Sequence, residues 1–315
     1  MTEKPEVTVV IPTHNRWSLM STTLASALAQ EDVDFEVLVV DDGSTDETPA
    51  RLAEIDHPRL RVLRHDESRG VSPARDWAIS LARGEWIAFL DSDDLWSPRY
   101  LRTKLDAARG TEAAFVYGAA VVLDTETSTV RPDVPAPRPE ELPARLLVGN
   151  AIPGGCSNVI ARTEAVRSAG DFDDRLMMLS DWDFWLRLAD VGRGLACPEV
   201  LVAYRRHPRN LTVTDLEHIG RELDYFAAKH RAERGMAFDR VAYSRWLAGE
   251  ARGARQAARI YLRTGRAYRS PGNIARAIGA PLGVWAVARA MRRVREGSAV
   301  EPAWLRPYRQ EADDA

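Results

Sequence analysis

The stretch that organises the chain is Glu85-Trp-Ile-Ala-Phe-Leu-Asp-Ser-Asp-Asp-Leu-Trp96. Residues 86–90 form an apolar run that suits a buried strand and is too short for a helix. Three carboxylates, Asp91, Asp93 and Asp94, follow within four residues. Open α/β sheets bind ligands at the carboxyl ends of their strands, and clustered carboxylates repel one another, so we expect a hard divalent cation among them. The simpler alternative is a solvated acidic loop that caps the next helix.

Outward from this stretch, apolar runs and helical patterns alternate with short connections. We predict strands over residues 7–11, 35–40, 60–64, 86–90, 113–117, 157–161 and 200–206. Helices are predicted over residues 17–30, 72–83, 98–108, 163–169 and 181–191, and over a segment that ends at residue 55. This alternation is typical of an α/β fold in which a mostly parallel sheet is flanked by helices.

Three local signals refine this pattern. Ser44 and Glu47 have the spacing of a capping box for the helix that ends at residue 55. Ser97 and Pro98 are expected to open the following helix, with the proline at its first position. The segment 131–143 contains five prolines and should be an exposed excursion.

The C-terminal third of the chain has a different pattern. After residue 215 no strand is apparent, and three helices are predicted over residues 216–234, 241–263 and 273–295. We therefore place a boundary near residue 212, which separates an α/β domain, 1–212, from a helical C-terminal region, 213–315. Between residues 252 and 295 arginines are frequent and acids are few, which leaves open contact with anionic lipid, homodimerisation, or simply solvated helix faces.

Composition limits the class of protein and its compartment. The formal net charge of the 315 residues is −3, so no overall positive field favours nucleic acid. Cys156 and Cys197 form neither a disulfide framework nor a zinc spacing, which fits a reducing cytosol. The first residues lack the apolar core of a signal peptide, and the apolar run 278–290 is shorter than a membrane span. We expect a cytoplasmic protein, with peripheral attachment to the inner face of the membrane left open.

Polar turns follow three of the predicted strands, at residues 12–16, 41–46 and 91–94. If the strands are parallel, these turns lie at one edge of the sheet. A carboxylate of Asp41 or Asp42 can accept the N3–H of a uracil or a ribose hydroxyl, and His14 can stack on the base. Asp93 would then hold a metal that bridges two phosphates. Each residue alone is more simply a turn residue, but the three turns together predict a nucleotide-diphosphate site.

From about residue 6 to residue 210 the chain resembles family 2 of the glycosyltransferases, of the GT-A type. The resemblance rests on five motifs in this order: Val9-Val-Ile-Pro-Thr-His-Asn-Arg16, Val39-Val-Asp-Asp-Gly-Ser-Thr-Asp46, Gly70-Val-Ser-Pro-Ala-Arg-Asp76, Gly84-Glu-Trp-Ile-Ala-Phe-Leu-Asp-Ser-Asp-Asp94 and Ser180-Asp-Trp-Asp-Phe-Trp185. It implies a Rossmann-like GT-A catalytic domain, a nucleotide-sugar donor with a UDP-sugar favoured, Mn²⁺ or Mg²⁺, and inversion at the anomeric carbon.

The resemblance also assigns roles by position. The residues that it places around the nucleotide are Pro12, Thr13, His14, Asn15, Arg16, Asp41, Asp42, Arg75, Asp91 and Ser92. Asp93 matches the metal ligand, and His207 lies in a late motif whose histidine can approach the metal or the diphosphate. Asp181 matches the general base. Two departures are His14, where a tyrosine is common, and Ser180, where a glutamate is common.

The chemistry of sugar transfer explains why an aspartate is needed at position 181. Transfer from a nucleotide-sugar is an in-line displacement, in which a metal neutralises the departing diphosphate and a carboxylate takes the acceptor's proton. Because Asp181 lies at the start of a predicted helix, we expect the helix dipole to lower its pKa. An N-cap role for Asp181 is the alternative. Gly154-Gly155 either lets the backbone approach the sugar or forms a plain turn.

Other functions remain as alternatives. A nucleotidyltransferase would need a glycine-rich phosphate loop early in the chain, and residues 12–16 contain no glycine. A glycosidase would need two opposed carboxylates and no nucleotide. A non-catalytic scaffold that binds sugar nucleotides is left open by Ser180. The acceptor of a transferase could be a carbohydrate, a lipid-linked sugar, a small molecule or a peptide.

Overall fold

The computed structural model describes residues 4–207, 210, 216–234, 258, 262 and 301–308. The chain forms two compact units, one made of residues 1–146, 150–206 and 300–315, and the other of residues 147–149 and 207–299. The helices predicted over 241–263 and 273–295 lie outside the described residues. The domain boundary near residue 212 stays a prediction.

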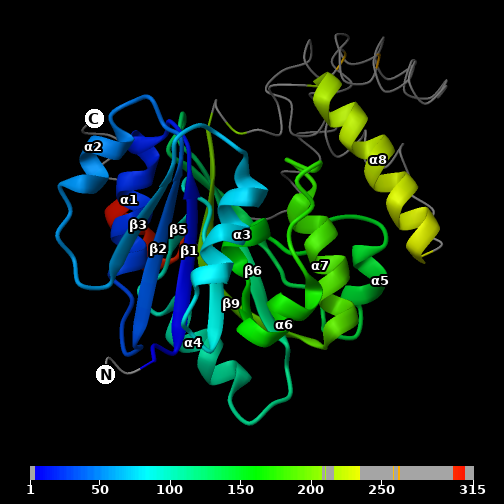
Figure 1. Ribbon diagram of the computed structural model, residues 1–315. Helices are drawn as coiled ribbons and strands as arrows, with labels where there is room; N and C mark the ends of the chain where they lie inside the picture. Colours follow the sequence, from blue (N-terminus) through cyan, green and yellow to red (C-terminus); the bar gives the residue numbers. More distant parts are fainter. Residues whose placement is uncertain are drawn as a thin grey trace. The chain divides into compact units, whose positions relative to one another are not determined.

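The first unit is built on a sheet to which nine described strands belong (Figure 1). They are β1 (Val7–Thr13), β2 (Phe35–Asp42), β3 (Leu60–His65), β4 (Trp86–Phe89), β5 (Leu95–Trp96), β6 (Phe115–Asp124), β7 (Thr129–Val134), β8 (Ile160–Arg162) and β9 (Gly194–Arg206). Their order is β3-β2-β1-β4-β8-β6-β9-β5, and β7 pairs with β6. The first four in this order run parallel, as predicted, whereas β5, β7 and β8 run antiparallel to their neighbours.

Helices flank this sheet, which confirms the predicted α/β class. In the first unit they are α1 (Trp17–Leu28), α2 (Thr48–Ala53), α3 (Val71–Leu81), α4 (Tyr100–Ala108), α5 (Leu142–Leu146), α6 (Thr163–Ala169) and α7 (Ser180–Val191), with the 3₁₀ turns η1 (Gly155–Asn158) and η4 (Ala303–Leu305). Helix α3 packs on β1 and β2, and α4 packs on β6 and β9 (Figure 1). The second unit contains α8 (Leu216–Arg234), at the predicted bounds. Among the described residues, no helix combines the length and apolar character that crossing a membrane requires.

The core has two apolar layers because successive strand residues point to opposite faces of the sheet. On one face, Val9 and Ile11 of β1 pack in a cluster with Met20 of α1. On the other, the ring of Phe89 on β4 lies edge-on to the rings of Phe184 and Trp185 of α7, at centroid distances of 6.1 and 5.9 Å. This second layer sets α7 against the strand that carries the acidic loop.

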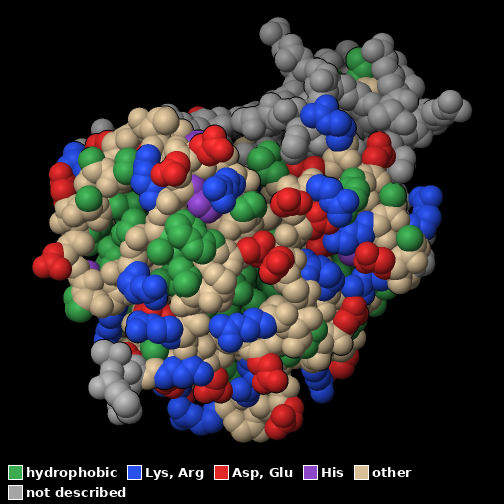
Figure 2. All heavy atoms as spheres, in the orientation of Figure 1, with side chains coloured by type: hydrophobic (Ala, Val, Ile, Leu, Met, Phe, Trp, Pro, Cys, Tyr) green, Lys and Arg blue, Asp and Glu red, His purple; other side chains and the backbone are tan. Residues whose placement is uncertain are grey.

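Surface charge follows the small net charge of the chain. Figure 2 shows acidic and basic side chains interspersed over the face that it presents, where they are not separated into two large areas.

Several predicted boundaries are wrong for physical reasons. Helix α4 begins at Tyr100, two residues after Pro98. The capping box does not form, because the Ser44 hydroxyl accepts the backbone N–H of Asn15 at 2.8 Å. The proline-rich segment contributes part of strand β7, including Pro132. The strand predicted over 157–161 begins only at residue 160, since Ser157 and Asn158 turn their polar side chains into the protein.

Asn158 and Lys104 anchor the turn that precedes β8. Both side chains are fully buried. The Asn158 amide donates to the carbonyls of Gly118 and Pro153, each at 2.8 Å. The Lys104 ammonium donates to Asn158 Oδ1 at 2.8 Å and lies 4.7 Å from the centre of the Tyr100 ring. Burial lowers the pKa of Lys104 from its ordinary 10.5 to about 7.

We therefore predict a stability difference that grows with pH between the wild-type protein and Lys104→Met. Between pH 7 and 10.5 the unfolded chain binds a proton at Lys104 that the folded protein has released, so the free energy of unfolding of the wild type rises with pH. The variant lacks this contribution. Denaturant unfolding at several pH values measures the difference, and a difference independent of pH would contradict the prediction. Lys4→Met, which removes an exposed ammonium, is the control.

Candidate active site

The three polar turns predicted at one sheet edge do meet there, because β1, β2 and β4 are parallel neighbours. Asn15 joins the first two turns: its side-chain oxygen accepts the backbone N–H of Thr45 at 2.7 Å. Its backbone is left-handed, with φ of 49°, a conformation that asparagine tolerates better than most residues. Arg16 joins the first turn to the third through a 2.7 Å ion pair with Asp93.

His14 is held as a fixed, exposed ring at the end of β1. Its Nδ1–H donates to the backbone oxygen of Asp42 at 2.6 Å, and its Nε2 then accepts from the Asn15 amide at 2.9 Å. Pro12 and Thr13 are buried beside it, and the Thr13 hydroxyl has no hydrogen-bond partner among the described residues.

The carboxylate of Asp42 supports a neighbouring loop. It accepts hydrogen bonds from His65 Nδ1 at 2.7 Å, the Ser68 hydroxyl at 2.7 Å, and the backbone N–H groups of Arg69 at 2.9 Å and Gly70 at 2.8 Å. Burial opposes the charge, but these donors outweigh burial and lower the pKa of Asp42. Four donors on two oxygens leave little accepting capacity for a ligand.

Asp41 is likewise committed to the protein. Its side chain is buried, accepts the backbone N–H of Ser44 at 3.1 Å, and forms an ion pair with Arg64. The two aspartates therefore shape the turn that follows β2.

The three carboxylates after β4 have three different environments. The Asp91 side chain is 33% exposed and pairs with Arg75, whereas the Asp93 side chain is 10% exposed and pairs with Arg16. Asp94 is fully buried and accepts hydrogen bonds from the Ser157 hydroxyl and from the backbone N–H of Arg205. Burial, followed by the charges of Asp93 and Asp91, raises the pKa of Asp94 well above its usual value. Of the three side chains, Asp91 and Asp93 thus keep exposure to solvent, Asp93 only a small fraction.

Ser92 lies between these acids and is buried. Its backbone oxygen accepts the Thr23 hydroxyl of α1 at 3.1 Å, which fixes the acidic loop from behind.

Arg75 connects the acidic loop to the start of α7. The buried guanidinium donates to Asp91 at 2.6 Å and to the Ser180 hydroxyl at 3.4 Å, and it lies 5.1 Å from the centre of the Phe172 ring. Burial works against its charge, but neighbouring groups, Asp91 among them, raise the pKa of Arg75 above its usual value.

Asp181 is brought to the same place as Asp91. Its Oδ1 accepts the backbone N–H of Trp182 and its Oδ2 accepts the side-chain amide of Asn150, both at 2.7 Å. Although the side chain keeps some exposure, desolvation raises the pKa of Asp181 to about 6, with Arg75 opposing and Asp91 adding to the shift. The expectation that the helix dipole lowers this pKa is therefore wrong, because desolvation is the larger effect.

Gly155 lies against this carboxylate. Its backbone has φ of 54°, and a Cβ at this position would lie 2.9 Å from Asp181 Oδ2. The positive φ favours glycine, and a side chain at this position would displace the Asp181 carboxylate. Asn150 and Ser157, which contact Asp181 and Asp94, were not predicted from the sequence. The adjacent Gly154-Gly155 pair was the signal that this segment approaches something closely.

His207 belongs to the second compact unit, where its backbone N–H donates to the side chain of Asn210. Its approach to a metal stays a prediction.

The accessible carboxylates suit a metal that is shared with a ligand. Among the described residues, no three His, Cys, Asp or Glu side chains converge as a complete chelating group. Asp91 and Asp93 each face a guanidinium, so the site is already built to hold positive charge. Mg²⁺ in particular is usually bound by one or two carboxylates together with phosphate oxygens, and the two acids fit that pattern.

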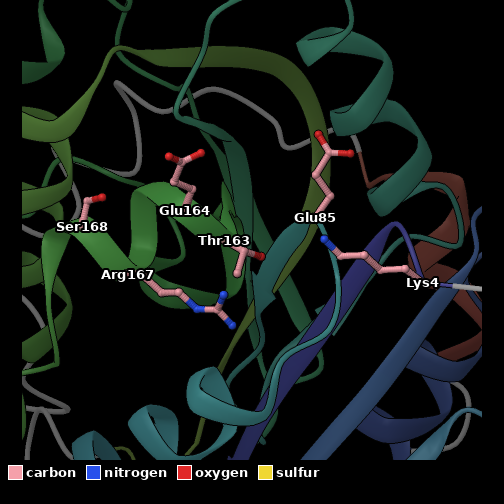
Figure 3. A pocket seen from close by; sticks show the side chains of 6 residues that line it. All are labelled: Lys4, Glu85, Thr163, Glu164, Arg167 and Ser168. Atoms are coloured by element: carbon pink, nitrogen blue, oxygen red, sulfur yellow. The ribbon is translucent and has the colours of Figure 1, made fainter.

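A hollow of about 420 Å³ lies elsewhere, where β1 and β4 begin (Figure 3). The residues that line it precede these strands or belong to α6: Lys4, Glu85, Thr163, Glu164, Arg167 and Ser168. The candidate residues lie at the opposite, carboxyl ends of β1, β2 and β4 or on α3 and α7, so this hollow is not part of the site.

Comparison with known proteins gives a family match. The model of glycosyl transferase family 2 matches residues 8–168, about half of the chain. Succinoglycan biosynthesis protein ExoO of Rhizobium meliloti (strain 1021) is 45% identical over 120 residues, which are 38% of this chain and 33% of that protein. The Escherichia coli UDP-Glc:alpha-D-GlcNAc-diphosphoundecaprenol beta-1,3-glucosyltransferase WfgD is 31% identical over 121 residues, 38% of this chain and 48% of that protein. The match thus spans a third to a half of these relatives.

Solved structures share the fold. The mannosyltransferase PcManGT from Pyrobaculum calidifontis, in complex with GDP-Man and Mn²⁺, aligns with a TM-score of 0.56 and 20% identity over 94% of this chain and 89% of that chain. S. aureus TarS 1-349 in complex with UDP-GlcNAc aligns with a TM-score of 0.59 and 17% identity over 98% and 87%. At these identities the likeness establishes the GT-A architecture.

The contacts of Asp42 predict that it acts mainly on stability. Asp42→Asn places an amide opposite four donors, and each donor left unpaired costs about 1–3 kcal/mol. We expect a lower free energy of unfolding by denaturant titration, whereas Asp66→Asn, an exposed change in the same loop, leaves it unchanged. Equal stability of the two variants would contradict this role.

Proposed function

We propose, from the premise that this chain belongs to glycosyltransferase family 2, that it transfers sugar with inversion from a nucleotide-diphosphate donor to an acceptor hydroxyl. Family membership supports a sugar-transferring enzyme. The observation that carries the proposal is the buried Arg75, which donates to Asp91 and reaches Ser180 beside Asp181. These contacts of Arg75 support a single site that holds both the sugar donor and the base.

The donor would lie across the three turns. The fixed ring of His14 would offer a flat face to the base, and the buried Thr13 hydroxyl, which has no hydrogen-bond partner among the described residues, lies beside it. Asp41 and Asp42 would act on the nucleotide through the loops that they hold. A UDP-sugar is favoured, because WfgD is named for UDP-Glc and TarS binds UDP-GlcNAc.

Asp93, with Asp91 beside it, would hold Mn²⁺ or Mg²⁺ on the diphosphate, and His207 is a further candidate ligand. The Mn²⁺ in the related mannosyltransferase structure supports a divalent ion here. When bound, such an ion neutralises the charge of the leaving diphosphate. Arg16, now paired with Asp93, would meet the same phosphates.

Asp181 would serve as the general base. Its carboxylate takes the proton of the acceptor hydroxyl as that oxygen attacks the anomeric carbon. The bond between that carbon and the diphosphate oxygen breaks on the opposite side, and the nucleoside diphosphate leaves with the electron pair. A single displacement of this kind inverts the anomeric centre, and it needs only one carboxylate to accept a proton.

The names of the relatives favour a carbohydrate or lipid-linked acceptor over a small molecule or a peptide. ExoO is named for succinoglycan biosynthesis, and WfgD for a diphosphoundecaprenol-linked sugar. Such an acceptor fits a cytoplasmic protein that works at the inner face of the membrane.

Loss of the Asp181 carboxylate should slow the transfer step. Asp181→Asn should lower kcat about 10²- to 10⁴-fold and leave the Kd for UDP with Mn²⁺ unchanged, because only the proton acceptor is lost. In the wild type, kcat/KM should fall as the pH drops below about 6, since the base must be ionised and its pKa is raised to about 6. Steady-state rates measure kcat and kcat/KM, and calorimetry measures the Kd for UDP. Asp190→Asn on the same helix is the control, and wild-type turnover by Asp181→Asn would overturn the role.

Loss of the Asp93 carboxylate should remove the effect of the metal on UDP binding. UDP should bind more tightly with Mn²⁺ than with EDTA, and Asp93→Asn should remove that difference while the protein stays folded. Calorimetric titration with UDP measures it, with Asp106→Asn on α4 as the control. If Asp93→Asn keeps the full response to Mn²⁺, the metal is held elsewhere.

A further inference from the structure

Asn150 contacts the carboxylate that the proposed mechanism uses as a base. Its side chain is exposed, and its amide Nδ2 donates to Asp181 Oδ2 at 2.7 Å. Gly155 lies beside the same oxygen and has no side chain that would come between Asn150 and Asp181. The other oxygen, Oδ1, accepts the backbone N–H of Trp182 within α7.

Among the described residues, further groups around Asp181 act on it by charge without a hydrogen bond to it. They are Arg75 from α3, Asp91 from the loop after β4, and Cys156 from η1. Arg75 is already engaged with Asp91 and Ser180. Within the described part of the chain, Asn150 is therefore the side chain that fixes the direction of the Asp181 carboxylate.

We propose that Asn150 is a positioning residue, whose side-chain amide holds Oδ2 of Asp181 and so turns the carboxylate toward the acceptor hydroxyl. The inference rests on the proposed role of Asp181 as the base. It adds a residue outside the five motifs, on the segment before η1.

The contact has a consequence for protonation. An amide N–H that donates to a carboxylate favours the charged form, so it works against the burial that raises the pKa of Asp181. Replacing the amide with a second carboxylate reverses the effect, because two like charges in contact disfavour ionisation of both. Replacing it with a methyl group removes the donor and adds no charge.

The test is a titration of the side-chain carboxyls in the full-length protein, labelled with ¹³C-aspartate and observed by NMR. The Asp181 signal is identified by its absence in Asp181→Asn. In Asn150→Asp the apparent pKa of Asp181 should rise by about one pH unit, and in Asn150→Ala by less. Ala144→Asp, which adds the same charge on the exposed surface of α5, should leave it unchanged.

Unfolding measurements and kinetics complete the test. Because Asn150 is exposed, its variants should unfold like the wild type. Their loss of activity should appear in kcat, with the Kd for UDP and Mn²⁺ unchanged. An Asp181 titration that is identical in wild type, Asn150→Asp and Asn150→Ala would overturn the inference. Wild-type turnover by Asp181→Asn would overturn the proposed base instead, so the two failures are distinguishable.

Discussion

The candidate site depends on one buried guanidinium. Asp91 and Asp181 come from a strand end and a helix start, and two carboxylates placed together repel each other. Arg75 lies between the elements that carry them, donates to Asp91 and reaches Ser180, and its charge favours the ionised form of Asp181. Without it, the acidic loop and the start of α7 would have no electrostatic reason to converge. The aromatic packing of Phe89 on α7 gives the apolar part of the same junction.

A second support comes from the segment before β8. Lys104 holds Asn158, Ser157 holds the buried Asp94, and Gly155 leaves room for Asp181. The short turn η1 therefore fixes the positions of the acidic loop and of Asp181. Because nearly every acid oxygen here has a donor from the protein, the site is organised before any ligand binds, which is what electrostatic catalysis requires.

Local patterns in the sequence were sufficient to predict the α/β class, the first four parallel strands and the meeting of three turns, but not the short strands β5 and β7. The apolar run at 86–90 and the alternation that places the first strands in parallel determine these features. Both can be read from residues that lie close together in the sequence. Burial and pairing are not local. That Asp42 supports a loop, that Asp94 faces inward, and that desolvation raises the pKa of Asp181 all depend on contacts between distant segments. Asn150 carries no motif, so no sequence pattern could single it out.

A crystal structure of the protein soaked with Mn²⁺ and UDP tests the central claim most directly, because anomalous scattering locates the ion without assumption. The account predicts an anomalous peak beside the carboxylates of Asp93 and Asp91, with the β-phosphate of UDP between that ion and the space in front of Asp181. A peak bound elsewhere, or a β-phosphate on the far side of the acidic loop from Asp181, would contradict it.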